Sequence, residues 1–180
     1  MQGSNVRELS TMSMCLALCC VTAYISFPLP FTPGLVTALT FALSLTAYIL
    51  NPKQTFAVIL AYILLGAAGL PVFAGGSGLG RLVGPAGGFY FAWLVAYPIL
   101  SAVKGSTPNF KRYLLANVLT AVPITYAGGL ISMMLVLDVN LWQAATMAVF
   151  PFIPGDLLKA AAASIIGVRL CYFSFGAKEK

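Results

Sequence analysis

One apolar, glycine-rich stretch divides this sequence: Gly69-Leu70-Pro71-Val72-Phe73-Ala74-Gly75-Gly76-Ser77-Gly78-Leu79-Gly80-Arg81-Leu82-Val83-Gly84-Pro85-Ala86-Gly87-Gly88. It cannot be a membrane helix, because each glycine in a helix interior costs about 1 kcal/mol and each proline about 3 kcal/mol. Irregular backbone near membrane depth is tolerated only where protein or water covers it. We therefore predict a loop that dips over or into a cavity. The alternative is a long flexible connector, which would usually be more polar.

The composition indicates an integral membrane protein. The 180 residues are 60% hydrophobic and 8% charged, with a mean hydropathy of +0.94, whereas soluble domains carry roughly 25% charged residues. We expect one compact membrane domain over residues 1–180. Histidine is absent and only four residues are acidic, so we predict no catalytic residue, no metal site and no cofactor. The sequence has no phosphate-binding glycine motif, so ATP-driven transport would need other subunits.

The apolar segments predict an all-α fold with six transmembrane helices. Each segment is near the ~20 residues that a bilayer requires, with allowance for tilt and partial insertion. Residues 1–8 are polar and are expected to fray. A further apolar segment, residues 140–150, is too short to cross, so we interpret it as a short interfacial or re-entrant helix before the sixth span. The six spans are expected at about residues 9–27, 35–50, 54–70, 89–103, 113–137 and 155–171.

The basic residues predict the orientation of these spans. Eight of them fall at the N-terminus, in the connections between spans 2 and 3 and spans 4 and 5, or at the C-terminal end, and the opposite side has only Arg81. Lysine and arginine are enriched on the cytoplasmic side, so both termini should be cytoplasmic and the glycine-rich loop external. The net charge of +6 does not indicate a nucleic-acid partner, because the basic residues fall singly between apolar spans.

Two charged residues lie inside the last apolar segment. Asp156 and Lys159 are three positions apart and therefore share one face of a helix. Asp156 is also explained as a cap at the helix N-terminus, with Lys159 as its ion-pair partner. A lysine at that end of the helix dipole is not explained by capping, and ionisable residues in a membrane span indicate a functional site.

Other residues extend this candidate site. Arg81 is the only basic residue of the external side, where it is either a solvated loop charge or an anchor for an anionic ligand. Together with Asp156 and Lys159 it would provide an acceptor, a donor and an anion clamp. Tyr126 lies midway along the fifth span, either as a ligand contact or as a core residue. The Gly128-Gly129 pair that follows favours close helix approach or a local break.

Small residues on the first helix suggest a contact with a neighbouring helix. Ser13 and Ala17 are four residues apart, as are Cys19 and Ala23. We interpret them as one smooth face for helix packing, within this chain or with a partner.

Two long motifs resemble the signature of the BioY family, the substrate-binding S components of energy-coupling factor (ECF) biotin transporters. One runs from Tyr62-Ile63-Leu64-Leu65-Gly66 through the loop to Gly84-Pro85-Ala86-Gly87-Gly88-Phe89, and the other is Phe152-Ile153-Pro154-Gly155-Asp156-Leu157-Leu158-Lys159. Tyr126-Ala127-Gly128-Gly129 loosely resembles a third block. The resemblance extends from the first helix to about Cys171.

This resemblance implies a six-helix S component in the cytoplasmic membrane. Its external biotin pocket would be roofed by the glycine-rich loop, and its partners would be a membrane T component and two cytoplasmic ATPases. Two positions depart from the family pattern. Leu39 stands where a glutamine is common, which affects the pocket wall. Ala17 is followed by Val21 instead of a second alanine, which affects docking to the T component.

The residues suggest how biotin would be held. We hypothesise that Asp156 accepts from a ureido N–H, while Lys159 donates to the ureido carbonyl or orients Asp156. Arg81 would bind the carboxylate. The remaining candidates are contacts from the loop, from aromatic walls of the thiophane ring and from the fifth span, namely Gly75, Gly76, Phe73, Phe89, Tyr90 and Tyr126.

Three other functions remain open at this point. The first is an S component for another small vitamin, which would differ only in pocket chemistry. The second is a membrane channel with the glycine-rich loop as a re-entrant filter, although the sequence has no internal repeat. The third is a membrane enzyme, which the absent histidines and scarce acids disfavour.

Overall fold

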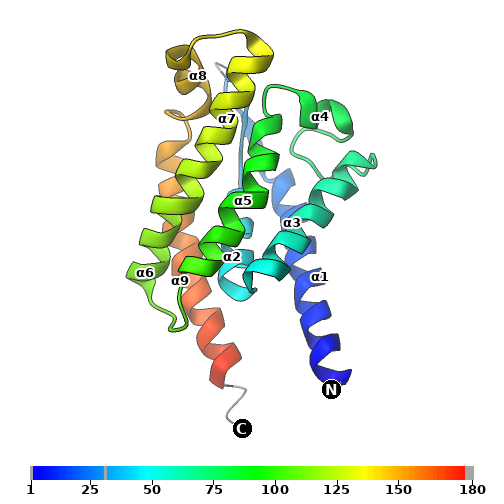
Figure 1. The fold of residues 1–180 in the computed structure, drawn as a ribbon, viewed down its shortest axis with the longest axis vertical. Helices are drawn as coiled ribbons and strands as arrows, with labels where there is room; N and C mark the ends of the chain where they lie inside the picture. The colour runs from blue at the N-terminus through cyan, green and yellow to red at the C-terminus, as the bar shows by residue number, and fades with distance from the viewer. Residues whose placement is uncertain (1, 31, 177–180) are drawn as a thin grey trace.

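The fold consists of helices and one two-stranded sheet (Figure 1). The computed structural model describes the backbone of residues 2–30 and 32–176. In chain order these contain α1 (Gln2–Tyr24), β1 (Ser26–Pro28), β2 (Leu35–Thr37), α2 (Leu39–Ile49), α3 (Pro52–Ala67), α4 (Leu79–Val83), α5 (Gly87–Val103), α6 (Phe110–Ala116), a π-helical turn (Asn117–Ala121), α7 (Val122–Leu137), α8 (Leu141–Ala148) and α9 (Ile153–Gly176).

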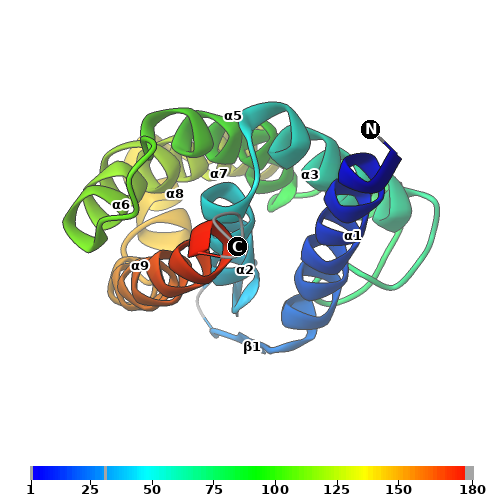
Figure 2. The ribbon, with the colours of Figure 1, turned by 90° about the horizontal axis from the view of Figure 1, so that it is seen from below.

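The short helix α2 lies inside the bundle. It packs against α1, α5 and α9, while α5 packs against α3 and α7. Figure 2 shows α2 between α9 and α1 when the molecule is seen along its length. Of its eleven residues, eight are buried. The core of the molecule therefore surrounds α2, and residues at the start of this helix can be reached from several neighbouring helices.

The connections fall into two groups at opposite ends of the molecule. Figure 1 shows both termini, the α2–α3 connection and the α5–α6 connection at one end, with α4 and α8 at the other. By length and hydropathy, two of the described stretches could cross a membrane alone, Val6–Tyr24 and Phe110–Leu137, and a third could if α8 and α9 count as one bent span. Helices α2, α3 and α5 are apolar but shorter.

The first connection differs from the expected turn. Residues predicted to end the first span and begin the second instead form an antiparallel pair, with Ser26 opposite Thr37 and Pro28 opposite Leu35. As a result α1 ends at Tyr24 and α2 begins only at Leu39. Proline fixes φ near −65° and has no N–H, which suits extended backbone at a sheet edge, and Pro28 lies in β1. The expected fraying is also wrong for residues 2–8, which belong to α1, while residue 1 lies outside the described residues.

The glycine-rich stretch is a structured loop. It contains one short helix, α4, and its backbone adopts positive φ at Gly75 and Gly76, which side chains rarely tolerate. Phe73 and Gly76 exchange backbone hydrogen bonds of 3.1 and 3.2 Å. The Gly78 N–H donates to the Gly66 carbonyl at 2.8 Å, which ties the loop to the end of α3. The interpretation as a flexible connector does not fit this arrangement.

The second half of the chain follows the prediction with two refinements. The expected short helix is α8, with Asn140 as its cap. The fifth span begins earlier, at Phe110, and contains the π-helical turn; the last helix is also longer than expected. At Gly128 an added Cβ would overlap the carbonyl of Gly88, so the glycine pair permits the close approach of α5 and α7.

One lysine at the end of α5 has a structural role. Lys104 Nζ donates to the carbonyls of Ala47, Tyr48 and Leu50 at 2.6, 2.8 and 2.6 Å. These carbonyls lie at the C-terminal end of α2, where a helix leaves acceptors unpaired. Lys104 therefore completes the short buried helix, and burial lowers the pKa of its ammonium group to about 8.

The expected smooth face on α1 is wrong. Ser13 and Ala17 are exposed, whereas Cys19 and Ala23 are fully buried against the core. Two residues further along a helix is about 200° of rotation, so the pair at 19 and 23 faces away from the pair at 13 and 17. Only Ser13 and Ala17 remain available to an outside partner, and Ala23 does not.

Candidate ligand-binding site

A cavity lies beneath the glycine-rich loop. Its walls come from β2 and the residues just before it, the start of α2, the glycine-rich loop, and helices α5, α7 and α9. The residues that line it are Pro33, Gly34, Leu35, Thr37, Leu39, Thr40, Ala74, Arg81, Ala86, Phe89, Tyr90, Trp93, Thr125, Tyr126, Phe152, Asp156 and Lys159.

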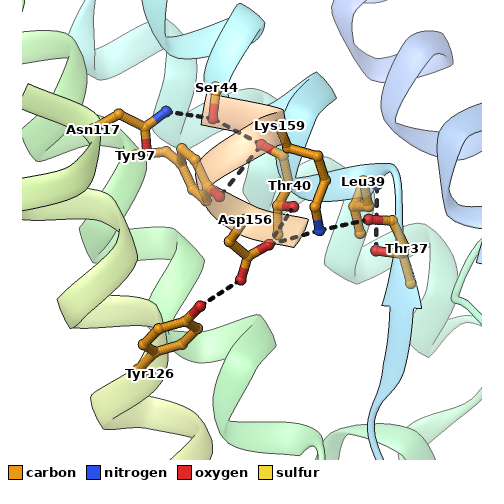
Figure 3. Close-up of polar contacts among 9 residues, drawn as sticks. All are labelled: Thr37, Leu39, Thr40, Ser44, Tyr97, Asn117, Tyr126, Asp156 and Lys159. Carbon is orange, nitrogen blue, oxygen red and sulfur yellow. Dashed lines mark hydrogen bonds and ion pairs between the residues drawn. The ribbon is translucent and has the colours of Figure 1, made fainter. Parts of the chain in front are cut away.

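An ion pair forms the polar end of this cavity. Lys159 Nζ lies 2.6 Å from Asp156 Oδ1, and the two side chains are only 20% and 12% exposed. Tyr126 donates its hydroxyl to Asp156 Oδ2 at 2.9 Å, and Thr40 donates to Oδ1 at 3.3 Å. Lys159 also donates to the carbonyl of Thr37 at 3.0 Å. Figure 3 shows the carboxylate held between α2, α7 and its own helix α9.

The partners of Asp156 bear on its role. Its carboxylate accepts hydrogen bonds from side chains of other helices, and the described residues include no bond from it to a backbone N–H of α9. Its place in the first turn of α9 still favours a negative charge through the helix dipole. Asp156 thus binds across the bundle and does not act as a side-chain cap.

The pair retains one free acceptor and one free donor. A carboxylate has about four lone-pair positions, and Lys159, Thr40 and Tyr126 occupy three of them. An ammonium has three donors, of which Asp156 and Thr37 take two. Because both residues line the cavity, the remaining acceptor and donor are complementary to a group that presents an N–H beside a carbonyl, as an amide or cyclic urea does.

A second layer of polar contacts supports the pair. The Thr40 carbonyl accepts from Ser44 at 2.8 Å and from Tyr97 at 3.5 Å. Ser44 in turn accepts from Asn117 at 2.8 Å. Asn117 is 2% exposed and belongs to the π-helical turn. These contacts fix the first turn of α2, which carries Thr40 into the site (Figure 3).

The glycine-rich loop adds a positive charge to the cavity. Arg81 lies on α4 and lines the cavity, and its guanidinium group donates to the carbonyl of Gly75. Among the lining residues Arg81 and Lys159 are cationic and Asp156 is anionic. Because Asp156 pairs with Lys159, the charge of Arg81 is in excess and favours an anionic ligand.

The sequence is similar to known proteins along most of its length. The model of the BioY family matches residues 1–173. This chain belongs to the BioY family. A Pyrococcus horikoshii protein named "Probable biotin transporter BioY" is 37% identical over 167 residues, which are 92% of this chain and 97% of that protein. The "Biotin transporter BioY" of Thermotoga maritima is 33% identical over 92% of this chain and 96% of its own length.

A solved structure supports the same fold. The crystal structure of an S-component for biotin from an ECF-type ABC transporter matches with a TM-score of 0.88. The match covers 96% of this chain and 94% of that chain, with 24% sequence identity. The BioY relatives and the apolar helices place this chain in a membrane.

Six of the nine predicted ligand contacts in this BioY chain line the cavity. They come from the loop and from helices α5, α7 and α9, namely Arg81, Phe89, Tyr90, Tyr126, Asp156 and Lys159. The ion pair and Tyr126, which are 30 residues apart in sequence, are in direct contact.

The other three predicted residues lie behind the cavity wall. Phe73 is 2% exposed and packs between Tyr62 and Tyr90, with ring centroids 5.6 and 4.5 Å apart. Gly75 and Gly76 form the turn of the loop, and the Gly75 carbonyl accepts from Arg81. None of the three lines the cavity, so they position the roof and the arginine.

Sequence reasoning missed several lining residues. Trp93 follows Tyr90 by three residues on α5, so helical spacing from the predicted Tyr90 would have indicated it. Thr125 precedes the predicted Tyr126, and Thr40 follows the noted Leu39. Thr37 and the neighbouring residues Pro33, Gly34 and Leu35 could not be predicted as lining residues from the sequence. They reach the cavity because β1 and β2 pair, and this pairing was not predicted. Leu39 does lie on the wall, where the departure from the family pattern was expected to act.

Proposed function

We propose that this protein is a biotin-binding S component that mediates biotin uptake across the cytoplasmic membrane. The observation that carries the proposal is the ion pair with one free acceptor and one free donor at the polar end of a cavity. The named biotin transporters among the BioY relatives, and the fold shared with a biotin S-component, support it. The protein binds its ligand and leaves ATP hydrolysis to partner subunits.

Biotin matches the cavity in three respects. Its ureido ring presents an N–H beside a carbonyl, which fits the free acceptor of Asp156 and the free donor of Lys159. Its thiophane ring is apolar and would lie among Phe89, Tyr90 and the nearby aromatic residues. Its carboxylate is a single negative charge, which fits Arg81 through a bidentate hydrogen bond.

The excess positive charge also separates biotin from other vitamins. Thiamine carries a permanent positive charge, and riboflavin has no charge for Arg81 to bind. A cavity with one excess cation therefore disfavours the first and gains nothing from the second.

The membrane arrangement is part of the same proposal. Six crossings would be made by α1, α2, α3, α5, the stretch from α6 to α7, and α9. Both termini would be cytoplasmic, because most basic residues lie at that end. Helix α4, whose Arg81 lines the cavity, lies at the opposite end (Figure 1). A T component and two ATPases would bind from the membrane and the cytoplasm, with the exposed Ser13 and Ala17 of α1 as the docking surface.

Competition binding tests the proposal. Purified protein in detergent is loaded with labelled biotin and challenged with biotin, biotin amide, thiamine and riboflavin. We expect only biotin to compete at equimolar concentration. In Arg81→Ala, affinity for biotin should fall about tenfold while affinity for the amide changes little, since the charge-assisted bond is worth about 1.5–3 kcal/mol. Equal losses for both ligands would remove Arg81 from the carboxylate site.

A further inference from the structure

Two buried polar groups in the cavity wall have no partner in the protein. Among the side chains that the structure describes, only Trp93 Nε1 and Thr125 Oγ1 are buried without a hydrogen bond. Trp93 is 7% exposed and Thr125 is 5% exposed. Both residues line the cavity described above. Buried polar groups are nearly always paired, so two exceptions in one wall indicate that something outside the chain pairs with them.

Thr125 also departs from the behaviour of other helical hydroxyls in this chain. Ser44, Thr46 and Ser164 each donate to the carbonyl four residues earlier, at 2.7–2.9 Å. The corresponding carbonyl for Thr125 belongs to Ala121, the last residue of the π-helical turn, and no such bond forms. The hydroxyl of Thr125 is therefore available to a ligand.

The position of Thr125 is close to the ion pair. A second, smaller cavity shares lining residues with the first, and Thr125 lines both. Asp156, Lys159 and Tyr126 also line both, whereas Trp93 lines only the first. Thr125 thus lies at the polar end of the site, and Trp93 belongs to the wall that α5 contributes to the first cavity.

We propose that Thr125 and Trp93 are specificity-determining contacts for the cyclic urea of the ligand. This inference rests on the proposed function. A cyclic urea has two N–H donors and an oxygen with two acceptor positions. The Asp156–Lys159 pair has one free acceptor and one free donor, which satisfies half of these. The Thr125 hydroxyl accepts from the second N–H, and the Trp93 indole N–H donates to the second acceptor position of the ureido oxygen.

The test removes each polar group: Thr125→Val keeps nearly the same side-chain shape, whereas Trp93→Phe removes one ring of the indole together with its N–H. Thr125→Val and Trp93→Phe are compared with the wild type by calorimetry with biotin and with desthiobiotin, which lacks the ring sulfur. Each variant should bind both ligands about fivefold to tenfold more weakly, the effect of one hydrogen bond. The loss should be the same for the two ligands, because both contain the cyclic urea.

Thermal unfolding without ligand separates this role from a structural one. Because the Thr125 hydroxyl is unpaired in the free protein, the melting temperature of Thr125→Val should stay unchanged or rise. Trp93→Phe also loses buried ring surface in the core, so it should melt lower, and its contact is tested by the binding measurements. Thr46→Val is the matched control: its hydroxyl bonds to the Ala42 carbonyl at 2.9 Å and the residue does not line the cavity. That variant should melt lower and bind biotin normally. Thr125→Ser, which keeps the hydroxyl, should bind like the wild type.

Binding by the variants tests the two contacts, and binding by the wild type tests the proposed function. Wild-type affinity in Thr125→Val or Trp93→Phe would overturn the corresponding contact, and so would a lower melting temperature with unchanged affinity. A Trp93→Phe loss with biotin that disappears with desthiobiotin would assign the indole to the sulfur and contradict the ureido contact. If the wild type does not bind biotin at all, the proposed function itself fails.

Discussion

Replacing Lys159 by methionine would test the ion pair in both the free and the bound protein. Methionine has a similar length and no charge, so the variant leaves the Asp156 carboxylate with Tyr126 and Thr40 as donors. The lost contacts are a 2.6 Å ion pair and a 3.0 Å bond to the Thr37 carbonyl. Hydrogen bonds to charged groups are worth about 1.5–3 kcal/mol.

The expected effects follow from the exposure of the pair. Since both side chains are partly exposed, we expect less than the roughly 3–5 kcal/mol of a fully buried pair, namely about 2 kcal/mol of unfolding free energy. For a chain of this size that is roughly 4–8 °C in melting temperature. Biotin affinity should fall by about tenfold to a hundredfold, because the donor to the ureido oxygen is lost.

A double variant completes the design. Asp156→Asn together with Lys159→Met removes both charges, and the amide can still contact Tyr126 and Thr40. We expect the melting temperature to recover most of the loss, while biotin binding remains weak. Thermal unfolding and calorimetry of the wild type, both single variants and the double variant form a complete cycle. Additive losses of stability in the double variant would refute the coupling of Asp156 and Lys159.

Three further predictions concern the scaffold and the partner surface. Gly128→Val should fold poorly or melt much lower than the wild type, because its side chain would overlap the Gly88 carbonyl; Ala127→Val on the same helix is the control, and equal melting would contradict the close contact. Lys104→Met should lower the unfolding free energy by about 1–3 kcal/mol, since three carbonyls of α2 lose their donor. In the folded protein the pKa of Lys104 is about 8, while the unfolded chain holds this proton to higher pH. Above pH 8 the unfolded state therefore binds more protons, so the free energy of unfolding of the wild type should rise relative to that of Lys104→Met from pH 8 to 10. A difference in unfolding free energy that stays constant over this range would contradict the buried ammonium. Ala17→Trp should leave biotin binding unchanged and abolish uptake in vesicles that contain the T component and the ATPases, because Ala17 is exposed on α1; normal uptake would remove this face from docking.

The sequence predicted the helices and the polar end of the site because those features are local. Apolar runs of fixed length mark the helices, and a spacing of three residues places Asp156 and Lys159 on one face. The motif resemblance then brought the loop and the last helix together at one site. The contact of Tyr126 with Asp156 joins two helices, and helical spacing alone left its role open.

The errors arose where the outcome depends on tertiary contacts. Strands β1 and β2 form because two extended segments of the chain pair with each other. The prolines in the sequence indicated only a turn at this place. Phe73 is aromatic and lies in the loop motif, yet it packs under the roof between Tyr62 and Tyr90. The proposed ligand contacts of Thr125 and Trp93 depend on which buried polar groups lack a partner. Only the three-dimensional structure shows this, since every other buried polar group among the described side chains is paired. The predicted single face of small residues on α1 was wrong for a reason visible in the sequence. At about 100° of rotation per residue, Ala17 and Ala23 point in different directions from the helix axis.

The most direct test of the central claim is calorimetry of the purified protein with biotin, alongside the Asp156→Asn variant. We expect saturable binding of one biotin per chain, and an affinity at least tenfold lower in the variant, since a charged acceptor is lost from the ureido site. Thermal unfolding should confirm that the variant is folded. No binding of biotin to the wild type, or equal affinity in Asp156→Asn, would contradict the account.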